Sequence, residues 1–228
     1  MTARPTVVFD FDGTLALGRG PLQAYITALG SQPGGDRAVE ASFAALAEFE
    51  TGTSAHRDAY DAVRTAALAQ GMRDADLGRA YLASRDLLGT DAAPVVAPKG
   101  LGDFLRELSA EATCVLATNA PPVGVERALI SLGIEDSISD RHHDVGKPAG
   151  LAPIITAHLR NGPVLAVGDI WEFDLAPAAL LGADTALVGV RETADARPTL
   201  RGAALSDLYD PIRDWAATPR TPHAPLTA

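Results

Sequence analysis

Four short apolar runs, separated by long intervals, constrain the fold of this chain more than any other feature. They lie at residues 7–9, 113–117, 164–167 and 185–190. Each run is bounded by Pro, Gly, Asp or Asn, as buried parallel strands usually are. Segments with helical spacing separate the last three runs. Strand and helix therefore alternate, which predicts an α/β fold with a doubly wound, Rossmann-like parallel sheet.

The interval from about Gly20 to Pro98 interrupts this alternation, because it has no convincing strand and is rich in alanine. Apolar residues recur in it at helical spacing, which predicts four helices joined by glycine-containing turns. We therefore expect a small all-helical domain inserted after the first strand. The expected domains are an α/β core at residues 1–19 and 99–216, a helical cap at 20–98 and a disordered, proline-rich tail at 217–228.

The pattern weakens after the last apolar run. We expect a short edge strand at Leu205 to Asp207, followed by a last helix that begins within Pro211 to Trp215. The segment His142-His143-Asp144 resembles a metal cluster, but adjacent histidines in a strand point apart and no further ligand has suitable spacing. We expect these three residues to form a loop near Lys147.

Composition argues against several classes of partner. The chain has 19 basic and 29 acidic side chains, and no run of Lys or Arg forms a stripe that would neutralise a nucleic acid backbone. No apolar stretch approaches transmembrane length, and no secretory signal is recognisable, so we expect no membrane partner. The single cysteine, Cys114, lies in an apolar run and suits a reducing compartment. We expect a cytoplasmic monomer or homodimer.

Seven polar residues follow or flank the expected strands. In open parallel sheets, ligands bind beyond the carboxyl ends of the strands, so residues in such positions converge on one site. The seven residues are Asp10 and Asp12, Thr118 and Asn119, Lys147, and Asp169 and Asp174.

Asp10 and Asp12 are the first pair in this set. An extended backbone would place the two carboxylates side by side while Phe11 turns into the core. One member of such a pair can attack phosphorus while the other transfers the proton. Taken alone, the run is equally compatible with a capped turn, because Asp and Gly are common turn residues.

The remaining residues fit a metal and an anion. Asp169 and Asp174 add hard oxygen ligands, which suit Mg²⁺ together with a substrate phosphate. Asp174 by itself would also suit the first turn of a helix, whose dipole favours acidic residues. Thr118 and Asn119 can present a hydroxyl and an amide to phosphate oxygens, and Lys147 can offset the negative charge of a phosphoryl group.

The order of these motifs resembles that of the haloacid dehalogenase-like (HAD) superfamily. The family's first motif, Asp-x-Asp-Gly-Thr, matches Asp10 to Thr14, and its second, a Thr that closes an apolar strand, matches Thr118. Its lysine matches Lys147, and its acidic motif, Gly-Asp-x-x-x-x-Asp, matches residues 168–174. The resemblance covers about residues 5–190, and the helical insert is similar to the family's C1-type cap.

This resemblance implies roles for the residues. Asp10 would be the nucleophile that forms an aspartyl-phosphate, and Asp12 the general acid that later activates water. Thr118 and Asn119 would bind the phosphate, and Lys147 would stabilise its charge. Dehalogenases of the family lack an acid at the position of Asp12, so this residue favours phosphoryl transfer.

The resemblance also implies a magnesium site. Asp10, the backbone carbonyl of Asp12, and Asp169 would hold the ion, with Asp174 as a direct or water-mediated ligand. We expect a magnesium-dependent phosphatase that acts on a small phosphorylated metabolite. A phosphomutase or phosphotransferase acting on a phosphosugar would use the same residues, so that alternative stays open. A non-catalytic phosphate-binding or regulatory protein is disfavoured, because the acid, base and metal positions are all intact.

Overall fold

The computed structural model describes residues 3–52, 54, 56–190 and 195–218. It divides into two compact units, which are treated separately below. The core unit comprises Met1–Leu17, Val96–Pro122 and Leu129–Ala228, and the cap unit comprises Gly18–Val95 and Val123–Ala128. Most of the tail expected at 217–228 lies outside the described residues.

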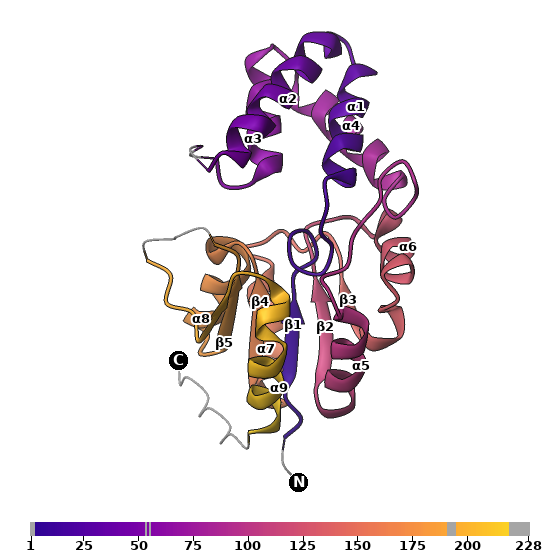
Figure 1. Cartoon of the computed structure of the whole chain (residues 1–228). Coiled ribbons are helices and arrows are strands. Elements are labelled where there is room, and N and C mark those ends of the chain that lie inside the picture. Colours follow the sequence, from indigo (N-terminus) through magenta and orange to yellow (C-terminus); the bar gives the residue numbers. More distant parts are fainter. Residues whose placement is uncertain (1–2, 53, 55, 191–194, 219–228) are drawn as a thin grey trace. The chain divides into compact units, whose positions relative to one another are not determined.

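The core unit contains a six-stranded parallel sheet with the strand order β3-β2-β1-β4-β5-β6 (Figure 1). The α/β class and the doubly wound topology are therefore confirmed. All four apolar runs form strands of this sheet. The strands are β1 (Thr6–Phe9), β2 (Thr113–Ala117), β3 (Asp140–His142), β4 (Val164–Gly168), β5 (Asp184–Val188) and β6 (Leu200–Gly202).

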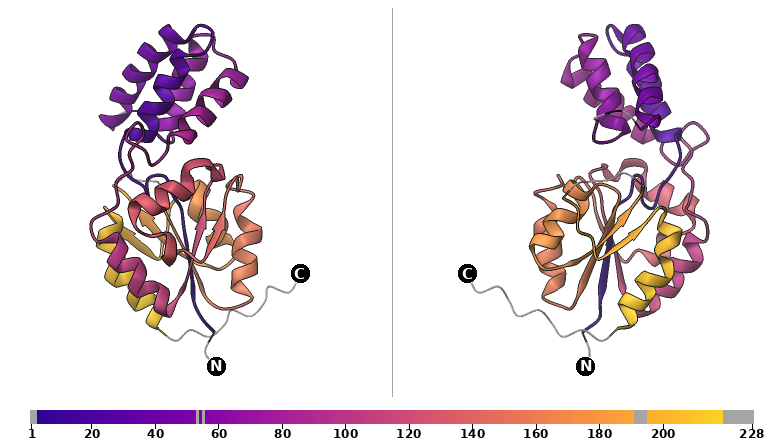
Figure 2. Two further views of the ribbon diagram at one scale, coloured as in Figure 1. Left: turned by 90° about the vertical axis from the view of Figure 1, so that its right-hand side faces the viewer. Right: turned by 60° about the vertical axis from the view of Figure 1, so that its left-hand side comes forward.

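Helices cover both faces of the sheet (Figure 2). The alternation of β1 side chains shows this directly, because Val8 joins the apolar cluster that contains residues of α7 and α8, whereas Phe9 packs edge-on against Phe104 of α5. Phe104 in turn stacks on Tyr209 of α9 at 4.1 Å. The core helices are α5 (Leu101–Glu111), α6 (Pro122–Leu132), α7 (Leu151–Leu159), α8 (Ala176–Leu180) and α9 (Tyr209–Ala217), with short turns η1 (Glu135–Ser137), η2 (Trp171–Leu175) and η3 (Leu205–Leu208).

Two expectations about the edges of the sheet are wrong. The segment expected as an edge strand forms the 3-10 turn η3, in which Leu205 and Leu208 are buried at a spacing of three rather than two. The Asp207 carboxylate accepts a hydrogen bond from the Ala204 amide (2.9 Å) and so stabilises the turn. At the other edge, His142 is not a loop residue, because it is the last residue of β3.

The cap unit is all-helical, as expected. Its helices are α1 (Gly20–Gly30), α2 (Gly35–Glu50), α3 (Ala59–Ala69) and α4 (Asp74–Asp86). Apolar side chains from all four helices form one buried cluster. Three tyrosines, Tyr25, Tyr60 and Tyr81, pack with ring centroids 5.9–6.2 Å apart, and the buried Arg85 guanidinium lies 4.9 Å from the ring centroid of Tyr81.

The start of α6 also belongs to the cap unit. Gly124 has a positive φ of +80°, and a Cβ there would lie 2.1 Å from the Arg85 carbonyl oxygen, so only glycine fits. Arg127 donates to the carbonyl oxygens of Leu88 (2.8 Å) and Asp86 (2.5 Å). No sequence pattern indicates this second segment of the cap.

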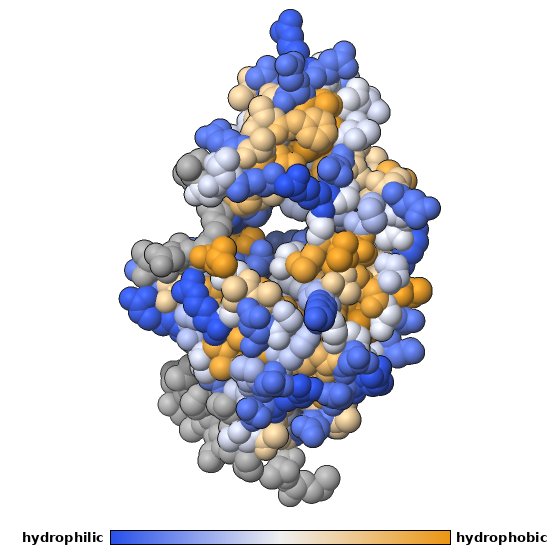
Figure 3. Space-filling model, in the orientation of Figure 1, coloured by the Kyte–Doolittle hydropathy of each residue, from blue (hydrophilic) through white to orange (hydrophobic). Residues whose placement is uncertain are grey.

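The surface agrees with the charge balance of the sequence. Hydrophilic side chains cover much of the face shown in Figure 3, and hydrophobic ones form small groups between them. Among the described residues, no helix has the length and apolarity that crossing a membrane requires.

Candidate active site

The turn that follows β1 fixes the position of Asp10. The Asp10 amide donates to the Val167 carbonyl oxygen (2.9 Å), which extends the pairing of β1 with β4 by one bond. Phe11 is fully buried, and its carbonyl oxygen accepts bonds from the amides of Leu15 (3.0 Å) and Ala16 (2.9 Å). The backbone thus leaves the sheet in a tight loop, with Asp10 at its base.

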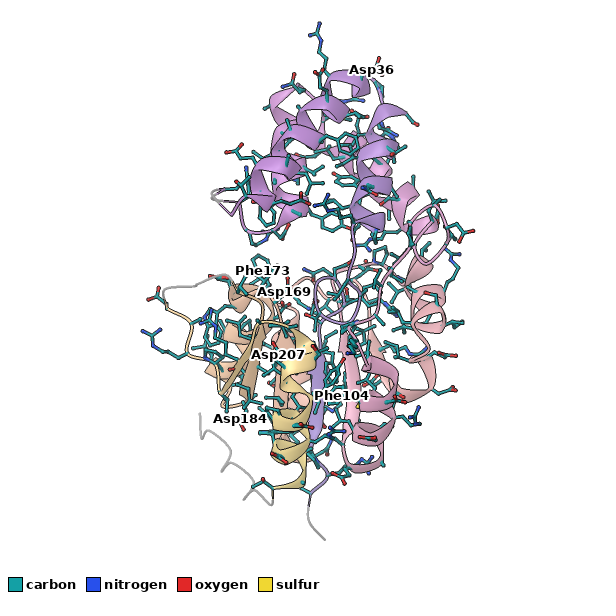
Figure 4. The ribbon with its side chains drawn as sticks, in the orientation of Figure 1. Asp36, Phe104, Asp169, Phe173, Asp184 and Asp207 are labelled. Carbon is teal, nitrogen blue, oxygen red and sulfur yellow. The ribbon has the colours of Figure 1, made fainter. Side chains whose placement is uncertain are left out.

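Glycine at position 13 allows this loop to approach β4. Gly13 has a φ of +88°, and a Cβ there would lie 2.5 Å from Asp169 Oδ2. Both the conformation and the space require glycine. The glycine of the first motif therefore brings the Asp10 loop against the Asp169 carboxylate, which lies at the carboxyl end of β4 near Phe173 (Figure 4).

Lys147 links two of the predicted carboxylates. Its Nζ donates to Asp10 Oδ1 (2.6 Å) and to Asp174 Oδ1 (2.8 Å). The side chains of Lys147, Asp10 and Asp174 are 3%, 11% and 6% exposed, so this ion triad is nearly dry. In such surroundings charge-assisted hydrogen bonds are strong and strictly positioned.

Asp169 and Asp174 complete an acidic cluster with Asp10. One carboxylate oxygen of each residue lies within 4.8 Å of the others. Asp174 stands in the π-helical turn η2, where its Oδ2 accepts a bond from the Ile170 amide (3.0 Å). Gly168 makes room for it, because a Cβ at that position would lie 2.4 Å from Asp174 Cβ.

Burial and charge shift the pKa values of the triad. Burial raises the pKa of Asp10 from 3.8 to about 7; the Lys147 charge opposes this rise, and the charges of Asp174 and Asp12 add to it. Burial disfavours the charged form of Lys147, but Asp10 and Asp174 outweigh it and hold the pKa of Lys147 above its usual range. Lys147 is therefore a fixed cation in this site. Further positive charge beside Asp10 would stabilise the ionised form of its carboxylate.

Thr118 and Asn119, the residues that follow β2, lie beside the Lys147 segment. Asn119 Oδ1 accepts a hydrogen bond from the Lys147 amide (2.7 Å), so this side chain positions the lysine backbone. Thr118 is buried, and its Oγ1 accepts from the Ala120 amide (3.0 Å). The Thr14 hydroxyl of the first motif is also buried, with no hydrogen-bond partner among the described residues.

The fold thus gathers Asp10, Lys147, Asp169 and Asp174 directly. Asp12 contributes no carboxylate oxygen to the acidic cluster, but it lies close enough for its charge to raise the pKa of Asp10. The contact of Asn119 with Lys147 was not predicted from the sequence. Nor was the close packing at Gly13 and Gly168, although the glycines themselves were the available signal.

Comparison with known proteins decides the family. A profile of haloacid dehalogenase-like hydrolases matches residues 7–168, which is most of the chain. The chain belongs to this family. The matched region contains the Asp10 loop, Thr118, Asn119 and Lys147, and the Asp169 and Asp174 carboxylates lie just beyond it. No curated protein sequence matches the chain significantly.

Solved structures of HAD-like proteins share the fold at low sequence identity. YfnB of Bacillus subtilis, a HAD-hydrolase solved with magnesium bound, is 17% identical with a TM-score of 0.61 over 93% of this chain and 100% of its own. A HAD phosphatase from Thermococcus onnurineus is 16% identical (TM-score 0.57, 91% and 97% covered). L-2-haloacid dehalogenase from Xanthobacter autotrophicus, solved with chloropropionic acid covalently bound, is 18% identical (TM-score 0.57, 92% and 98% covered). These similarities concern the fold, and they include both phosphatase and dehalogenase structures.

Proposed function

We propose that this HAD-like hydrolase is a magnesium-dependent phosphatase that uses Asp10 as a covalent phosphate acceptor. The observation that supports it most is the buried triad in which Lys147 contacts both Asp10 and Asp174. A fixed cation beside a carboxylate at a strand end is suited to an incoming anion and to the charge of a transferring phosphoryl group.

The donor set at the strand ends fits magnesium. Asp10, Asp169 and Asp174 offer only hard oxygen atoms, and one oxygen of each residue lies within 4.8 Å of the others. Asp10 and Asp169, with the backbone carbonyl of Asp12, would hold the ion, which supplies positive charge to the phosphoryl oxygens when bound. Both oxygens of Asp174 already accept bonds, from Lys147 Nζ and from the Ile170 amide. We assign Asp174 chiefly to orienting Lys147, with any metal contact made through water.

The chemistry of the protein groups then divides between the two aspartates. Asp10 attacks phosphorus, and the bond to the leaving oxygen breaks as Asp12 protonates that oxygen. Asp12, now a carboxylate, takes a proton from water, which attacks the aspartyl-phosphate and releases Asp10. Thr118 and Asn119 are assigned to the phosphate oxygens and Lys147 to the negative charge that Asp10 and the phosphoryl group share. The substrate class that suits this chemistry is a small phosphorylated metabolite.

Phosphatase and dehalogenase activity are separated by one assay with two substrates. The purified protein should release phosphate from p-nitrophenyl phosphate only when magnesium is present, and it should release no chloride from 2-chloropropionate. Asp10→Asn should abolish phosphate release without loss of folded structure. Asp12→Asn should still form the phosphoenzyme with this good leaving group but should hydrolyse it slowly. Chloride release without phosphate release would refute the proposal.

A second experiment addresses the final acceptor. If water is the acceptor, hydrolysis in ¹⁸O-labelled water should place one labelled oxygen in each released phosphate. Transfer of an unlabelled phosphoryl group to an added sugar would instead support the phosphotransferase alternative. We place the protein in the cytoplasm as a monomer or homodimer, and fractionation of the host cells together with size-exclusion chromatography would test this.

A further inference from the structure

A second group of metal-binding side chains lies at the edge of the sheet, on β3 and α7. Asp140 and His142 are two residues apart on β3 and so point to the same face. His142 Nε2 lies 3.0 Å from Asp140 Oδ2, and His158 Nε2 of α7 lies 3.7 Å from the same oxygen. One ligand atom of each residue lies within 4.8 Å of the others. We call these residues the Asp-His-His group.

The packing of α7 on the sheet brings this group together. Asp140 pairs in register with Val115 of β2, and His142 pairs with Ala117. Val115 and Ala117 belong to the apolar cluster that Leu151 and Ile155 of α7 cover, so the face of Asp140 and His142 is the face that α7 covers.

His158 completes the group from α7. It follows Leu151 by seven residues and Ile155 by three, so it continues the helical stripe that faces the sheet. Three positions where the pattern favours apolar side chains therefore carry two imidazoles and a carboxylate. The side chain of His158 is only 16% exposed.

We propose that the Asp-His-His group binds a divalent transition metal, and that zinc is the ion it fits best. Zinc takes nitrogen and oxygen ligands in a tetrahedron, and bond lengths of about 2.0–2.1 Å place neighbouring ligand atoms about 3.3 Å apart. The observed separations from Asp140 Oδ2, 3.0 Å and 3.7 Å, lie on either side of that value. Two imidazoles favour zinc over magnesium, which prefers oxygen ligands. Three protein ligands leave a fourth position for water.

A metal in the Asp-His-His group would stabilise the elements on either side of the segment that carries Lys147. His142 and His158 lie on the two elements that flank this segment, and Lys147 lies between them in the sequence. The His142 carbonyl oxygen also accepts a bond from the Thr118 amide (2.9 Å). A metal at this position would join the end of β3 to the last turn of α7, the two elements between which the Lys147 segment runs. It shares no residue with the acidic cluster of the active site.

Zinc titration of the full-length, metal-free protein against a chromophoric chelator tests the proposal. We expect one zinc ion to bind, and His142→Gln and His158→Gln each to weaken this site by about 100-fold or more, since even second-shell partners contribute about 10- to 100-fold. Asp169→Asn removes a carboxylate from the active-site cluster and should leave zinc affinity unchanged. Circular dichroism would establish that each variant is folded.

His56 provides a matched control in the cap unit. Its Nδ1 lies 3.3 Å from Asp61 Oδ2, so it forms a histidine–aspartate pair like that of His142 and Asp140, but no second histidine joins the pair among the described residues. His56→Gln should not change zinc affinity. His223, outside the described residues, is present in every variant.

Cobalt gives a spectroscopic readout of the ligands. Co²⁺ bound to the wild type should show the visible absorption of a tetrahedral nitrogen and oxygen site, and the bands should disappear in His158→Gln. Equal zinc affinity in wild type, His142→Gln and His158→Gln would overturn the proposal and leave the group as a hydrogen-bonded network. Loss of zinc binding in Asp169→Asn but not in His158→Gln would also overturn it, because the ion would then lie in the acidic cluster.

Discussion

Removal of the Lys147 ammonium is the sharpest test of the buried triad. Lys147→Met keeps an unbranched side chain but deletes the cation that lies 2.6 Å from Asp10 and 2.8 Å from Asp174. Breaking a buried ion pair by removing one partner leaves an uncompensated charge and costs about 3–5 kcal/mol. The three side chains are 11% exposed or less, so solvent screens this cost very little. We expect the metal-free variant to lose about 3–5 kcal/mol of unfolding free energy at pH 8.

The loss should depend on pH in a defined direction. Burial raises the pKa of Asp10 from 3.8 to about 7, so the folded state binds an extra proton between these values. Stability from this group is therefore lost as pH rises through that window, by about 4 kcal/mol in the wild type. Removing Lys147 raises the pKa of Asp10 further and extends the loss to higher pH. The difference between variant and wild type should therefore be smaller at pH 5, where the lost contact with Asp174 dominates it, than at pH 8, where the charge of Asp10 adds to it.

Urea unfolding followed by tryptophan fluorescence measures this effect in the core unit alone. Both tryptophans of the chain, Trp171 and Trp215, lie in that unit. With a urea m-value of about 3 kcal/mol/M, the midpoint should fall by about 1–1.7 M at pH 8 in EDTA. Lys99, the other lysine of the chain, is exposed, so Lys99→Met is the matched control and should move the midpoint very little.

Two results would refute the reasoning. Equal stability of Lys147→Met and Lys99→Met at pH 8 would mean that the triad contributes no charge compensation. A loss that is the same at pH 5 and pH 8 would mean that packing, rather than charge, explains the effect. The triple variant, with Asp10→Asn and Asp174→Asn added to Lys147→Met, should recover much of the lost stability, since it leaves no buried charge behind.

Three further predictions address other parts of the chain. Gly168→Ala should destabilise the core by about 1–3 kcal/mol and lower phosphatase activity, because the added Cβ would displace Asp174. Gly78→Ala, on the exposed face of α4, should instead stabilise the cap by about 0.5–1 kcal/mol in thermal unfolding. Burial raises the pKa of Cys114 from 9.0 to about 12, so at pH 8 its thiolate fraction is about 1,000-fold below that of the unfolded chain, and iodoacetamide should label it only in urea. Magnesium should raise the melting temperature of the core in wild type but not in Asp169→Asn, and an equal rise in both would place the ion elsewhere.

The central strands were predictable because their burial requires apolar side chains, which the sequence shows directly. Residues 7–9, 114–117 and 164–167 are buried on both faces of the sheet, so each of these runs had to be apolar throughout. The polar residues Asp10, Thr118 and Asp169 follow these runs directly, which made their convergence predictable from topology. The four cap helices were predictable from helical periodicity, since each buries one stripe against the others.

The two edge strands were not predictable in the same way. β3 reads Asp140-Arg141-His142 and is half-buried, and β6 reads Leu200-Arg201-Gly202 with its arginine exposed. A short edge strand is held by hydrogen bonds to one neighbour, and its own side chains need not be apolar. Hydropathy therefore missed both strands and instead favoured Leu205 to Asp207, where Leu205 and the following Leu208 are buried at the spacing of a helical turn.

Edge strand β3 also explains why the place of Lys147 is hard to predict from the sequence. The lysine follows no apolar run, and its place is set by bonds that main-chain amides of its own segment donate to the loop after β2. Asp144 and Val145 donate to the carbonyl oxygens of Ala120 and Thr118 (both 3.1 Å), and the Lys147 amide donates to Asn119 (2.7 Å). Because these bonds use backbone groups, no residue type on the lysine segment reveals them. Two of the polar side chains on β3, Asp140 and His142, belong to the Asp-His-His group and lie on the face that α7 covers, where hydropathy alone predicts apolar residues.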